Sequence, residues 1–496
     1  MSPKKVLLFF LLVGVIILPA VVFFPANGIQ IGAFRLKMIS INNIIGKDTV
    51  KYTNIDNIIG ISKNIDSLPD ILKSSNDTAN FNSEKFKASV DNLSQSIYRM
   101  EYGLEGKNNL YNFFKLLRSG ITNKEQIRIL HYGDSQIEGD RITAYLRNKL
   151  QQNFGGFGPG LLPVVQPYDS YFSAVQSNAG RWYRYTIFNN KDPRINHNRF
   201  GVLAAFSRFA PAVPVDESFI PDNIYSASFQ ISESKIAYSN VRKFKRLRIF
   251  YGNSNTKVEV KISAKGKLLI KDSLEAKVNL SSFNFNFPEY VKNVKIEFSG
   301  YDSPDIYAID LSDKVGLEVD NISMRGASGT MFTRMNFIHL QAMYKTLNVK
   351  MFILQFGGNV IPYTTGSVAI ENYGNWFYNQ LILLKKMMPE ATIIVVGPSD
   401  MSHKVGEDYV TYENLPKVRD ALRSATLKAG YSYWDMYMAM GGYNSMPSWV
   451  SARPSLAGVD YTHFTPTGAK LIANMFYNAL MMEFKESEII KSTAKK

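Results

Sequence analysis

The chain contains no cysteine among its 496 residues and only five histidines. The absence of cysteine excludes disulfide bridges and thiolate metal sites, although it does not identify a cellular compartment. No two histidines have the spacing of paired zinc ligands, which argues against a zinc enzyme. We therefore expect a protein that works without a metal ion and without a cofactor.

Acidic residues are also comparatively few, because 42 Asp and Glu stand against 57 Lys and Arg, which gives a net charge of +15. Such an excess favours anionic surroundings, such as a membrane surface or an acidic glycan. The basic residues are scattered and no recognised nucleic-acid-binding motif concentrates them, so we expect no nucleic-acid partner. The 45% share of hydrophobic residues is typical of a globular chain, and 496 residues predict two or three domains.

One long uncharged apolar run lies near the N-terminus, from Val6 to Phe24. Its nineteen residues, at 1.5 Å rise each, nearly cross the hydrocarbon core of a bilayer. Lys4 and Lys5 precede the run and would stay in the cytoplasm. Residues 1–28 are therefore expected to form a signal anchor, a transmembrane helix that places the rest of the chain in the cell envelope (periplasmic). A cleaved signal peptide is the alternative, but bulky residues occupy the positions where cleavage needs small ones.

The next segment, 29–104, is predicted to be a stalk followed by lead-in helices. Residues 29–80 are polar and show little periodicity, whereas residues 81–104 have helical spacing. This part of the chain carries no residue pattern typical of a site.

From residue 105 the sequence alternates between strand-like and helix-like segments. Short continuous apolar runs, typical of strands buried on both faces, are "IRILHY" (127–132), "VKMFILQF" (349–356) and "TIIVVGP" (392–398). Helical spacing follows in "RITAYLRNKLQQNF" (141–154), "GNWFYNQLILLKKMM" (374–388) and "GAKLIANMFYNALMMEF" (468–484). The alternation predicts an α/β fold, a doubly wound parallel sheet of the flavodoxin-like kind.

The middle of the chain, residues 165–310, has an all-β pattern instead. Apolar and charged residues alternate in "KVEVKIS" (257–263) and "NVKIEFSG" (293–300), and turn-rich stretches separate such runs. The simplest interpretation is a β-sandwich inserted into an α/β domain that is discontinuous, residues 105–164 and 311–496. Whether the sandwich binds a ligand or acts as a spacer stays open.

A serine lies at the first junction between strand and helix, in "HYGDSQIEGD" (131–140). Ser135 is expected at the carboxyl edge of the sheet, where α/β proteins bind ligands. Backbone N–H groups that open a helix there favour a developing negative charge. Taken alone, Ser135 is as well explained as a helix N-cap.

A histidine with an acidic partner lies in "DYTHFTPTGAKLIA" (460–473). Thr465 and Pro466 form a good N-cap and first-turn pair for the last helix, so Asp460 and His463 belong to the loop before it. An aspartate three residues before a histidine can accept the Nδ1–H, which leaves Nε2 to act as a base. A lone loop histidine is more often a surface residue.

Two further residues can meet an oxyanion. Gly326, in "RGASG", allows a substrate close to its N–H, and Asn359, in "GGN", offers a side-chain amide at the end of a strand. Each alone is more often a turn or cap residue.

These four pieces, in this order, resemble the four blocks of the SGNH (GDSL) hydrolase superfamily. The resemblance implies that Ser135 is the nucleophile, His463 the base and Asp460 its orienting acid. It also implies an oxyanion hole formed by the N–H groups of Ser135 and Gly326 with the amide of Asn359. The sequence departs from many members at Val360, where an acid is common, and at Gln136, where leucine is usual.

The longer string at 131–160, together with an inserted β module, is similar to peptidoglycan O-acetylesterases. This similarity implies a carbohydrate-binding-like sandwich and a serine esterase that removes O-acetyl groups from an envelope glycan, peptidoglycan or exopolysaccharide. An O-acetyltransferase of the same fold is an alternative, and would work beside a membrane O-acyltransferase partner. A non-catalytic glycan-binding protein is a third possibility. In each case the expected partners are an acetylated glycan and, through the N-terminal helix, the membrane.

Overall fold

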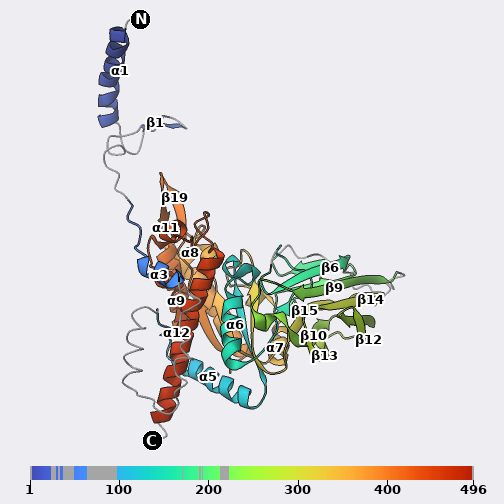
Figure 1. Ribbon diagram of the computed structural model, residues 1–496. Coiled ribbons are helices and arrows are strands. Elements are labelled where there is room, and N and C mark those ends of the chain that lie inside the picture. The colour runs from blue at the N-terminus through green and yellow to red at the C-terminus, as the bar shows by residue number, and fades with distance from the viewer. Residues whose placement is uncertain are drawn as a thin grey trace. The chain divides into compact units, whose positions relative to one another are not determined.

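The computed structural model describes residues 3–23, 29–31, 34–36, 50–63, 98–169, 171–188, 192, 194–212 and 223–493 (Figure 1). They fall into two compact units, Met1–Lys51 and Tyr52–Lys496.

The first unit contains one helix and one small hairpin. Helix α1 (Pro3–Phe23) covers most of the predicted apolar run, and β1 (Ile29–Ile31) pairs antiparallel with β2 (Phe34–Leu36). Within the part of the chain that the structure describes, no helix combines the length and the apolarity that a membrane crossing requires. The structure therefore does not support the predicted transmembrane helix over residues 1–28, of which residues 1–2 and 24–28 lie outside the described part.

The second unit is built on the expected parallel sheet. Its strand order is β16-β4-β17-β18-β21-β3, and every neighbouring pair is parallel except the last, β21 with β3. The strands are β4 (Gln126–Gly133), β16 (Gly316–Ser323), β17 (Val349–Gln355), β18 (Thr392–Val396), β21 (Ser432–Trp434) and β3 (Glu101–Tyr102). The α/β prediction is confirmed, with the three predicted apolar runs forming β4, β17 and β18.

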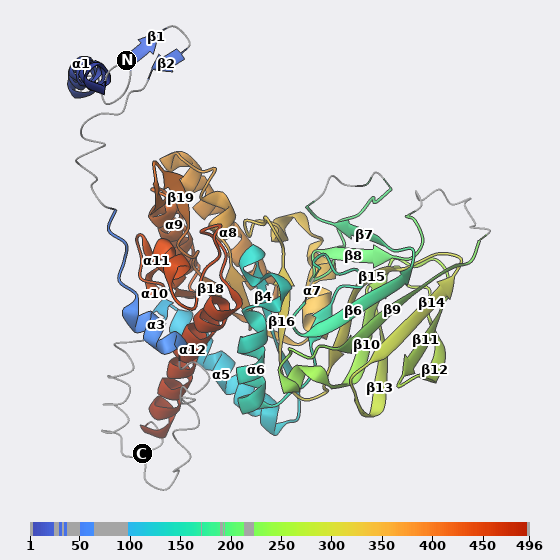
Figure 2. The ribbon, with the colours of Figure 1, turned by 45° about the horizontal axis from the view of Figure 1, so that its top comes forward.

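Helices cover both faces of this sheet. Successive strand side chains point to opposite faces, so Ile129 belongs to one apolar core and Leu130 to the other. The first core contains side chains of α5 (Gly106–Thr122), α6 (Thr143–Phe154) and α12 (Pro466–Thr493). The second core contains side chains of α7 (Phe337–Thr346), α8 (Ser367–Met387) and α9 (Leu415–Lys428). This is the doubly wound arrangement (Figure 2).

Two antiparallel sheets lie between β4 and β16 in the sequence. One has the order β13-β10-β15-β8-β7, with β5 paired to β15, and the other the order β12-β11-β14-β9-β6. Their strands are β5 (Gly160–Leu162), β6 (Ala174–Gly180), β7 (Tyr183–Thr186), β8 (Ala205–Arg208), β9 (Tyr225–Glu233), β10 (Phe244–Gly252), β11 (Val258–Ala264), β12 (Lys267–Leu274), β13 (Ser281–Val291), β14 (Val294–Gly300) and β15 (Asp305–Ser312). A third apolar core, with members such as Ile249, Val260 and Ile296, contains residues from both sheets.

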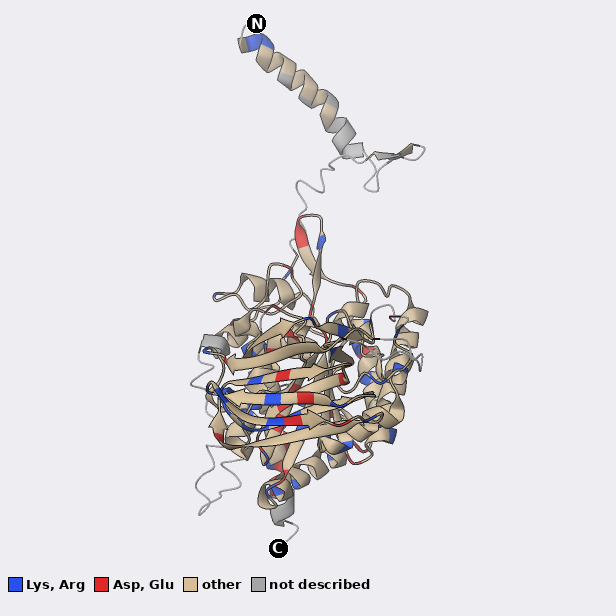
Figure 3. Cartoon of the chain, turned by 90° about the vertical axis from the view of Figure 1, so that its right-hand side faces the viewer, with Lys and Arg blue, Asp and Glu red and all other residues tan. Residues whose placement is uncertain are grey.

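The five-stranded sheet alternates as its sequence predicts. Val258, Val260 and Ile262 are buried, whereas the residues between them face outward. On that outward face acids and bases form ion pairs, Lys261 and Lys271 with Glu259 among them (Figure 3).

The lead-in segment differs from its prediction. The helical spacing over 81–104 does not produce a helix at its end, because Glu101–Tyr102 pair with β21 as the edge strand β3. Residues 81–97 lie outside the described part. In the predicted stalk, helix α3 (Asp56–Lys63) follows Ile55, which is buried in the core that contains α12.

Candidate active site

Ser135 lies directly beyond the carboxyl end of β4, as expected. It does not begin an α-helix but a short 3₁₀ helix, η2 (Ser135–Asp140), which kinks at Glu138 and Gly139 before α6. A Cβ on Gly133 would lie 2.9 Å from the Ile137 side chain and 3.0 Å from the Gln355 carbonyl oxygen, so the turn requires glycine there. Ser135 is the first residue of η2, and its N–H therefore has no acceptor within the helix.

His463 and Ser135, 328 residues apart in sequence, are in direct contact. The distance from Ser135 Oγ to His463 Nε2 is 2.8 Å. On the other side of the ring, His463 Nδ1 lies 2.7 Å from Asp460 Oδ2. The structure thus brings together the three residues that the sequence singled out for a nucleophile, a base and an orienting acid.

The loop that carries His463 is held firmly at both ends. Gly458 N–H donates to the His463 carbonyl oxygen at 2.7 Å, and the Asp460 carboxylate accepts the backbone N–H groups of Thr462 and His463. Thr465 Oγ1 accepts from Gly468 N–H at the start of α12, which confirms the predicted N-cap. The imidazole therefore has a fixed position before any substrate binds.

Asp460 is suited to stay ionised beside the imidazole. Partial burial by itself would raise the pKa of its carboxyl. The hydrogen bonds from His463 and Thr462 have the larger opposite effect, so the pKa lies below its usual value. An ionised Asp460 keeps the proton of a neutral imidazole on Nδ1, so that Nε2 can take the proton of the serine hydroxyl.

Asn359 lies in the 3₁₀ helix η5 (Gly358–Val360), after β17. Its side chain connects the segment before Ser135 with the segment after Gly326. Its Nδ2 donates to Asp134 Oδ2 and to the Ala327 carbonyl oxygen, each at 3.1 Å. Ala327 directly follows Gly326, whose φ of +79° favours glycine. A Cβ built on Gly326 meets no atom within 4 Å, so open space lies in front of this backbone.

Asp134 is a site residue to which the sequence assigned no role. It is 3% exposed, and its carboxylate accepts the Gln136 N–H at 2.9 Å as well as the Asn359 amide. Burial raises the pKa of Asp134 to about 6, although its hydrogen bonds and the nearby His463 each act to lower the pKa. Its place between Gly133 and Ser135 in the motif was the signal that could have indicated this role.

Gln136 is the second residue without a predicted role, and it contacts the histidine loop. Its Nε2 donates to the Thr462 carbonyl oxygen at 2.6 Å and to Ser399 Oγ at 3.0 Å. Adjacent residues on one segment therefore contact adjacent residues on the other, Ser135 with His463 and Gln136 with Thr462. The sequence signal for this role was that Gln136 stands where leucine is usual in the superfamily that the sequence resembles.

The remaining polar residues of the motif make structural contacts. His131 is buried between Gln355 and Thr143, and Asp140 forms a buried ion pair with Arg147 at 2.7 Å. Glu138 pairs with Arg325, the residue before Gly326. The Arg325 side chain is 68% exposed. Asp435 has a structural role too, since it caps α10 (Met436–Ala439) by accepting from Met438 N–H.

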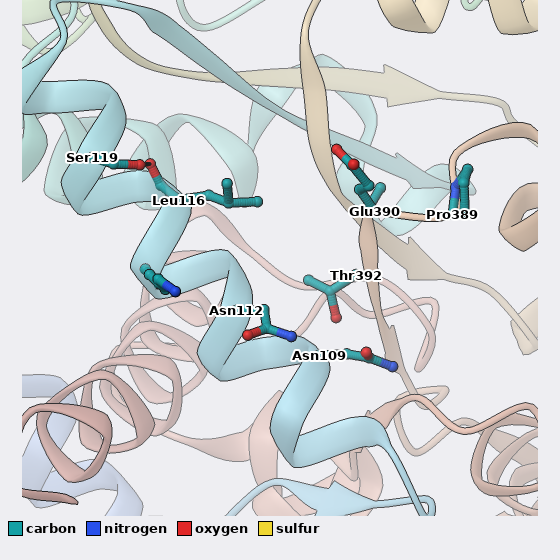
Figure 4. Close-up of a pocket in the computed structure, with 9 residues that line it drawn as sticks. Asn109, Asn112, Leu116, Ser119, Pro389, Glu390 and Thr392 are labelled. Carbon is teal, nitrogen blue, oxygen red and sulfur yellow. Dashed lines mark hydrogen bonds between the residues drawn. The ribbon is translucent and has the colours of Figure 1, made fainter. Parts of the chain in front are cut away.

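A separate hollow lies at the opposite, amino-terminal edge of the parallel sheet. It has a volume of about 370 Å³ and lies between α5 and the start of β18, with Asn109, Asn112, Glu390 and Thr392 in its wall (Figure 4). None of its nine lining residues is a histidine, and none belongs to the four blocks. We therefore place the candidate site at the carboxyl edge, around Ser135.

The sheet order, the helices on both faces and the four blocks at one edge define the fold of the SGNH hydrolases. No family model and no curated protein matches the chain. Among solved structures, a peptidoglycan O-acetylesterase is similar with 19% sequence identity and a TM-score of 0.59, covering 76% of this chain and 96% of that one.

Two further solved structures are similar over less of the chain. One is a family two carbohydrate esterase from Cellvibrio japonicus (10% identity, TM-score 0.25, 63% of this chain and 99% of that one). The other is an acetyl xylan esterase (13% identity, TM-score 0.26, 33% of this chain and 81% of that one).

Proposed function

We propose that the chain is a serine esterase that removes O-acetyl groups from a cell-envelope glycan, peptidoglycan or exopolysaccharide. The observation that carries the proposal is the contact chain from Ser135 Oγ to His463 Nε2 at 2.8 Å and from His463 Nδ1 to Asp460 at 2.7 Å. The likeness in fold to a peptidoglycan O-acetylesterase, whose name describes such a reaction, supports the glycan as substrate.

The reaction follows from the positions of these groups. Ser135 Oγ attacks the acetyl carbonyl carbon while His463 Nε2 takes the hydroxyl proton, and Asp460 stabilises the imidazolium. The N–H groups of Ser135 and Gly326, with the Asn359 amide, donate to the oxyanion of the tetrahedral intermediate. The C–O bond to the glycan breaks, the glycan oxygen takes the proton from His463, and an acetylated Ser135 remains. Water then attacks this ester with His463 again as base. The bond between the acetyl carbon and Ser135 Oγ breaks, Oγ takes the proton back from His463, and acetate is released.

The decisive test uses residues 29–496 and the Ser135→Ala variant. Wild-type protein is expected to hydrolyse p-nitrophenyl acetate, to take up a fluorophosphonate label, and to release acetate from O-acetylated peptidoglycan. Ser135→Ala should lose all three activities, whereas Ser451→Ala, an exposed serine on α11 (Ser445–Ser451), should keep them. Turnover retained by Ser135→Ala would overturn the mechanism.

The same assay separates the two alternatives. Acetate that appears on an added glycan acceptor rather than in solution would indicate an O-acetyltransferase, which would work with a membrane O-acyltransferase. Glycan binding without turnover or labelling would indicate a non-catalytic binding protein that uses the antiparallel sheets of residues 165–310 as a β-sandwich insertion in a discontinuous domain, 105–164 and 311–496.

We further propose that the protein acts in the cell envelope, outside the cytoplasm, because that is where its proposed substrate lies. Fractionation of cells that express the full chain, or the chain without residues 1–28, tests this location. The full chain is expected in the envelope fraction and the shortened chain in the cytoplasm. Equal distribution of both forms would contradict the proposal.

A further inference from the structure

We propose that Tyr409 and Tyr461 form an aromatic platform beside His463 that binds a sugar ring of the glycan. The inference rests on the proposed function, and it adds a binding subsite to the reacting groups described above. The platform is defined as the stacked rings of Tyr409 and Tyr461, with Tyr52 and Asp408 at its edge.

Tyr461 belongs to the same loop as the catalytic pair. It lies one residue after Asp460 and two before His463, and its φ of +54° is a conformation that side chains other than glycine rarely adopt. Its N–H donates to Gly458 O, and its carbonyl oxygen accepts from Ser402 N–H at 3.1 Å. Tyr461 is partly buried and packs against the core that contains α12. Position and backbone of this tyrosine are therefore fixed relative to the imidazole.

Tyr409 lies on a hairpin that reaches over this loop. The hairpin consists of β19 (Ser402–Val405) and β20 (Asp408–Thr411), and it projects from the second unit (Figure 1). The Tyr409 ring lies on the Tyr461 ring with centroids 3.5 Å apart and planes inclined by 3°. Tyr461 packs against the core and Tyr409 lies on the projecting hairpin, so we take the face of Tyr409 that points away from Tyr461 as the surface that meets the sugar.

Polar groups lie at the edge of the rings. Tyr52, which is 43% exposed, directs its hydroxyl to Asp408 Oδ1 at 3.4 Å, a long hydrogen bond that a ligand hydroxyl can replace. A pyranose has C–H groups on its faces and hydroxyl groups around its rim. A rigid aromatic face with a phenol and a carboxylate at its edge matches both features. A pair of rings that served packing alone would need neither the exposed phenol nor the carboxylate.

The test compares a glycan with a small ester that is too short to reach the platform. For Tyr409→Ala we expect the ratio of kcat/KM on O-acetylated peptidoglycan fragments to kcat/KM on p-nitrophenyl acetate to fall roughly three- to tenfold, mainly through KM. Tyr409→Phe keeps the ring and should keep the ratio. Tyr301→Ala removes a tyrosine that is 51% exposed outside the platform, and it should also keep the ratio.

Loss of folding cannot obscure the result. Tyr409→Leu keeps an apolar contact on Tyr461 while it removes the flat ring, and it should lower the ratio as Tyr409→Ala does. An equal loss on both substrates, or an unchanged ratio in both variants, would show that the pair only packs the hairpin and would overturn the platform. Failure of the wild type on p-nitrophenyl acetate, by contrast, would overturn the esterase itself.

Discussion

The side chain of Asn359 holds two other segments of the candidate site together, and it is also the proposed oxyanion donor. In the resting structure its Nδ2 donates both to the buried Asp134 carboxylate and to the Ala327 carbonyl oxygen. These two acceptors fix which end of the amide faces Gly326, since only the nitrogen end can donate to them. Both N–H groups of the amide are engaged in this way, so the oxyanion takes over one of them from its present acceptor while the other hydrogen bond keeps the amide in place.

Replacement of Asn359 by alanine should therefore lower kcat by about 10²–10³-fold, with a smaller change in KM, because the oxyanion exists only in the transition state and intermediate. Steady-state kinetics on p-nitrophenyl acetate measure the effect. Asn375→Ala, at an exposed position on α8, is the matched control and should change neither constant. A fall in kcat of less than tenfold for Asn359→Ala would exclude the amide from the oxyanion hole.

Gln136 acts on the base rather than on the oxyanion. Because it holds the carbonyl oxygen of Thr462 at 2.6 Å, it fixes the peptide that precedes His463. Gln136→Met keeps the shape but removes the donor, and we expect kcat to fall by about one to two orders of magnitude, since small misplacement of a catalytic group is costly. KM should change little. A lower thermal midpoint with normal kcat would mean that Gln136 only stabilises the fold.

The hairpin of β19 and β20 depends on a buried carboxylate at its base. Asp400 is fully buried and accepts from Thr411 Oγ1 and from Met446 N–H, each at 2.7 Å. Thr411 ends β20, and Met446 belongs to α11. This one side chain therefore ties the hairpin that carries Tyr409 to a helix near the histidine loop.

The stability that Asp400 contributes should depend on pH. Burial raises its pKa to about 6, in spite of the hydrogen bonds that oppose the shift. The folded chain then binds this proton more tightly than the unfolded chain, in which an aspartate titrates near 4. The contribution is fully present below about pH 4 and is lost as the pH rises through about 6.

Asp400→Asn removes this titration. We expect the difference in unfolding free energy between wild type and variant to be larger at pH 4.5 than at pH 7.5, by about 1–3 kcal/mol. Urea unfolding at the two pH values measures it. A difference that is the same at both pH values would show that Asp400 has an ordinary pKa in the folded chain.

The elements that the sequence predicts well are those whose signal is local. Continuous apolar runs indicate β4, β17 and β18, and helical spacing with a Thr-Pro start indicates α12. Strand β3 has only two residues and no period, so only its pairing with β21 defines it. The kink of η2 depends on the extended backbone of Glu138 and on the positive φ of Gly139, of which only the glycine is a sequence signal.

The site divides in the same way. Ser135, Gly326, Asn359, Asp460 and His463 could be singled out because four blocks recur in a fixed order. The contacts of Asp134 with Asn359, of Gln136 with Thr462 and of Tyr409 with Tyr461 join segments far apart in the sequence. No local pattern indicates such contacts, because each depends on how the loops meet at the edge of the sheet.

A buried ion network joins the parallel sheet to the antiparallel ones. Arg128 on β4 pairs with Asp320 on β16 at 2.7 Å and with Asp310 on β15 at 2.9 Å, and all three side chains are fully buried. Arg248 on β10 also contacts Asp310 at 2.7 Å. Burial by itself would raise the pKa of Asp310, but the arginines around it hold the pKa well below its usual range. The pair of Arg128 with Asp310 thus links the charges of the parallel sheet to those of the antiparallel one.

Removal of Arg128 leaves two buried carboxylates without their shared partner. Arg128→Met should therefore lower the unfolding free energy by about 3–5 kcal/mol, as expected when one member of a buried ion pair is lost. Arg194→Met breaks a pair whose arginine is 43% exposed, and it should have little effect.

The network also predicts how the second unit unfolds. Because Arg128 belongs to β4, the strand that leads to Ser135, loss of the antiparallel sheets leaves unpaired charge in the strand that positions the nucleophile. Wild type should then unfold in one transition, seen alike by tryptophan fluorescence and by loss of p-nitrophenyl acetate turnover in urea. In Arg128→Met the two signals should separate, with turnover lost first. Two separate transitions already present in the wild type would mean that the sheets are energetically independent and that the network does not couple them.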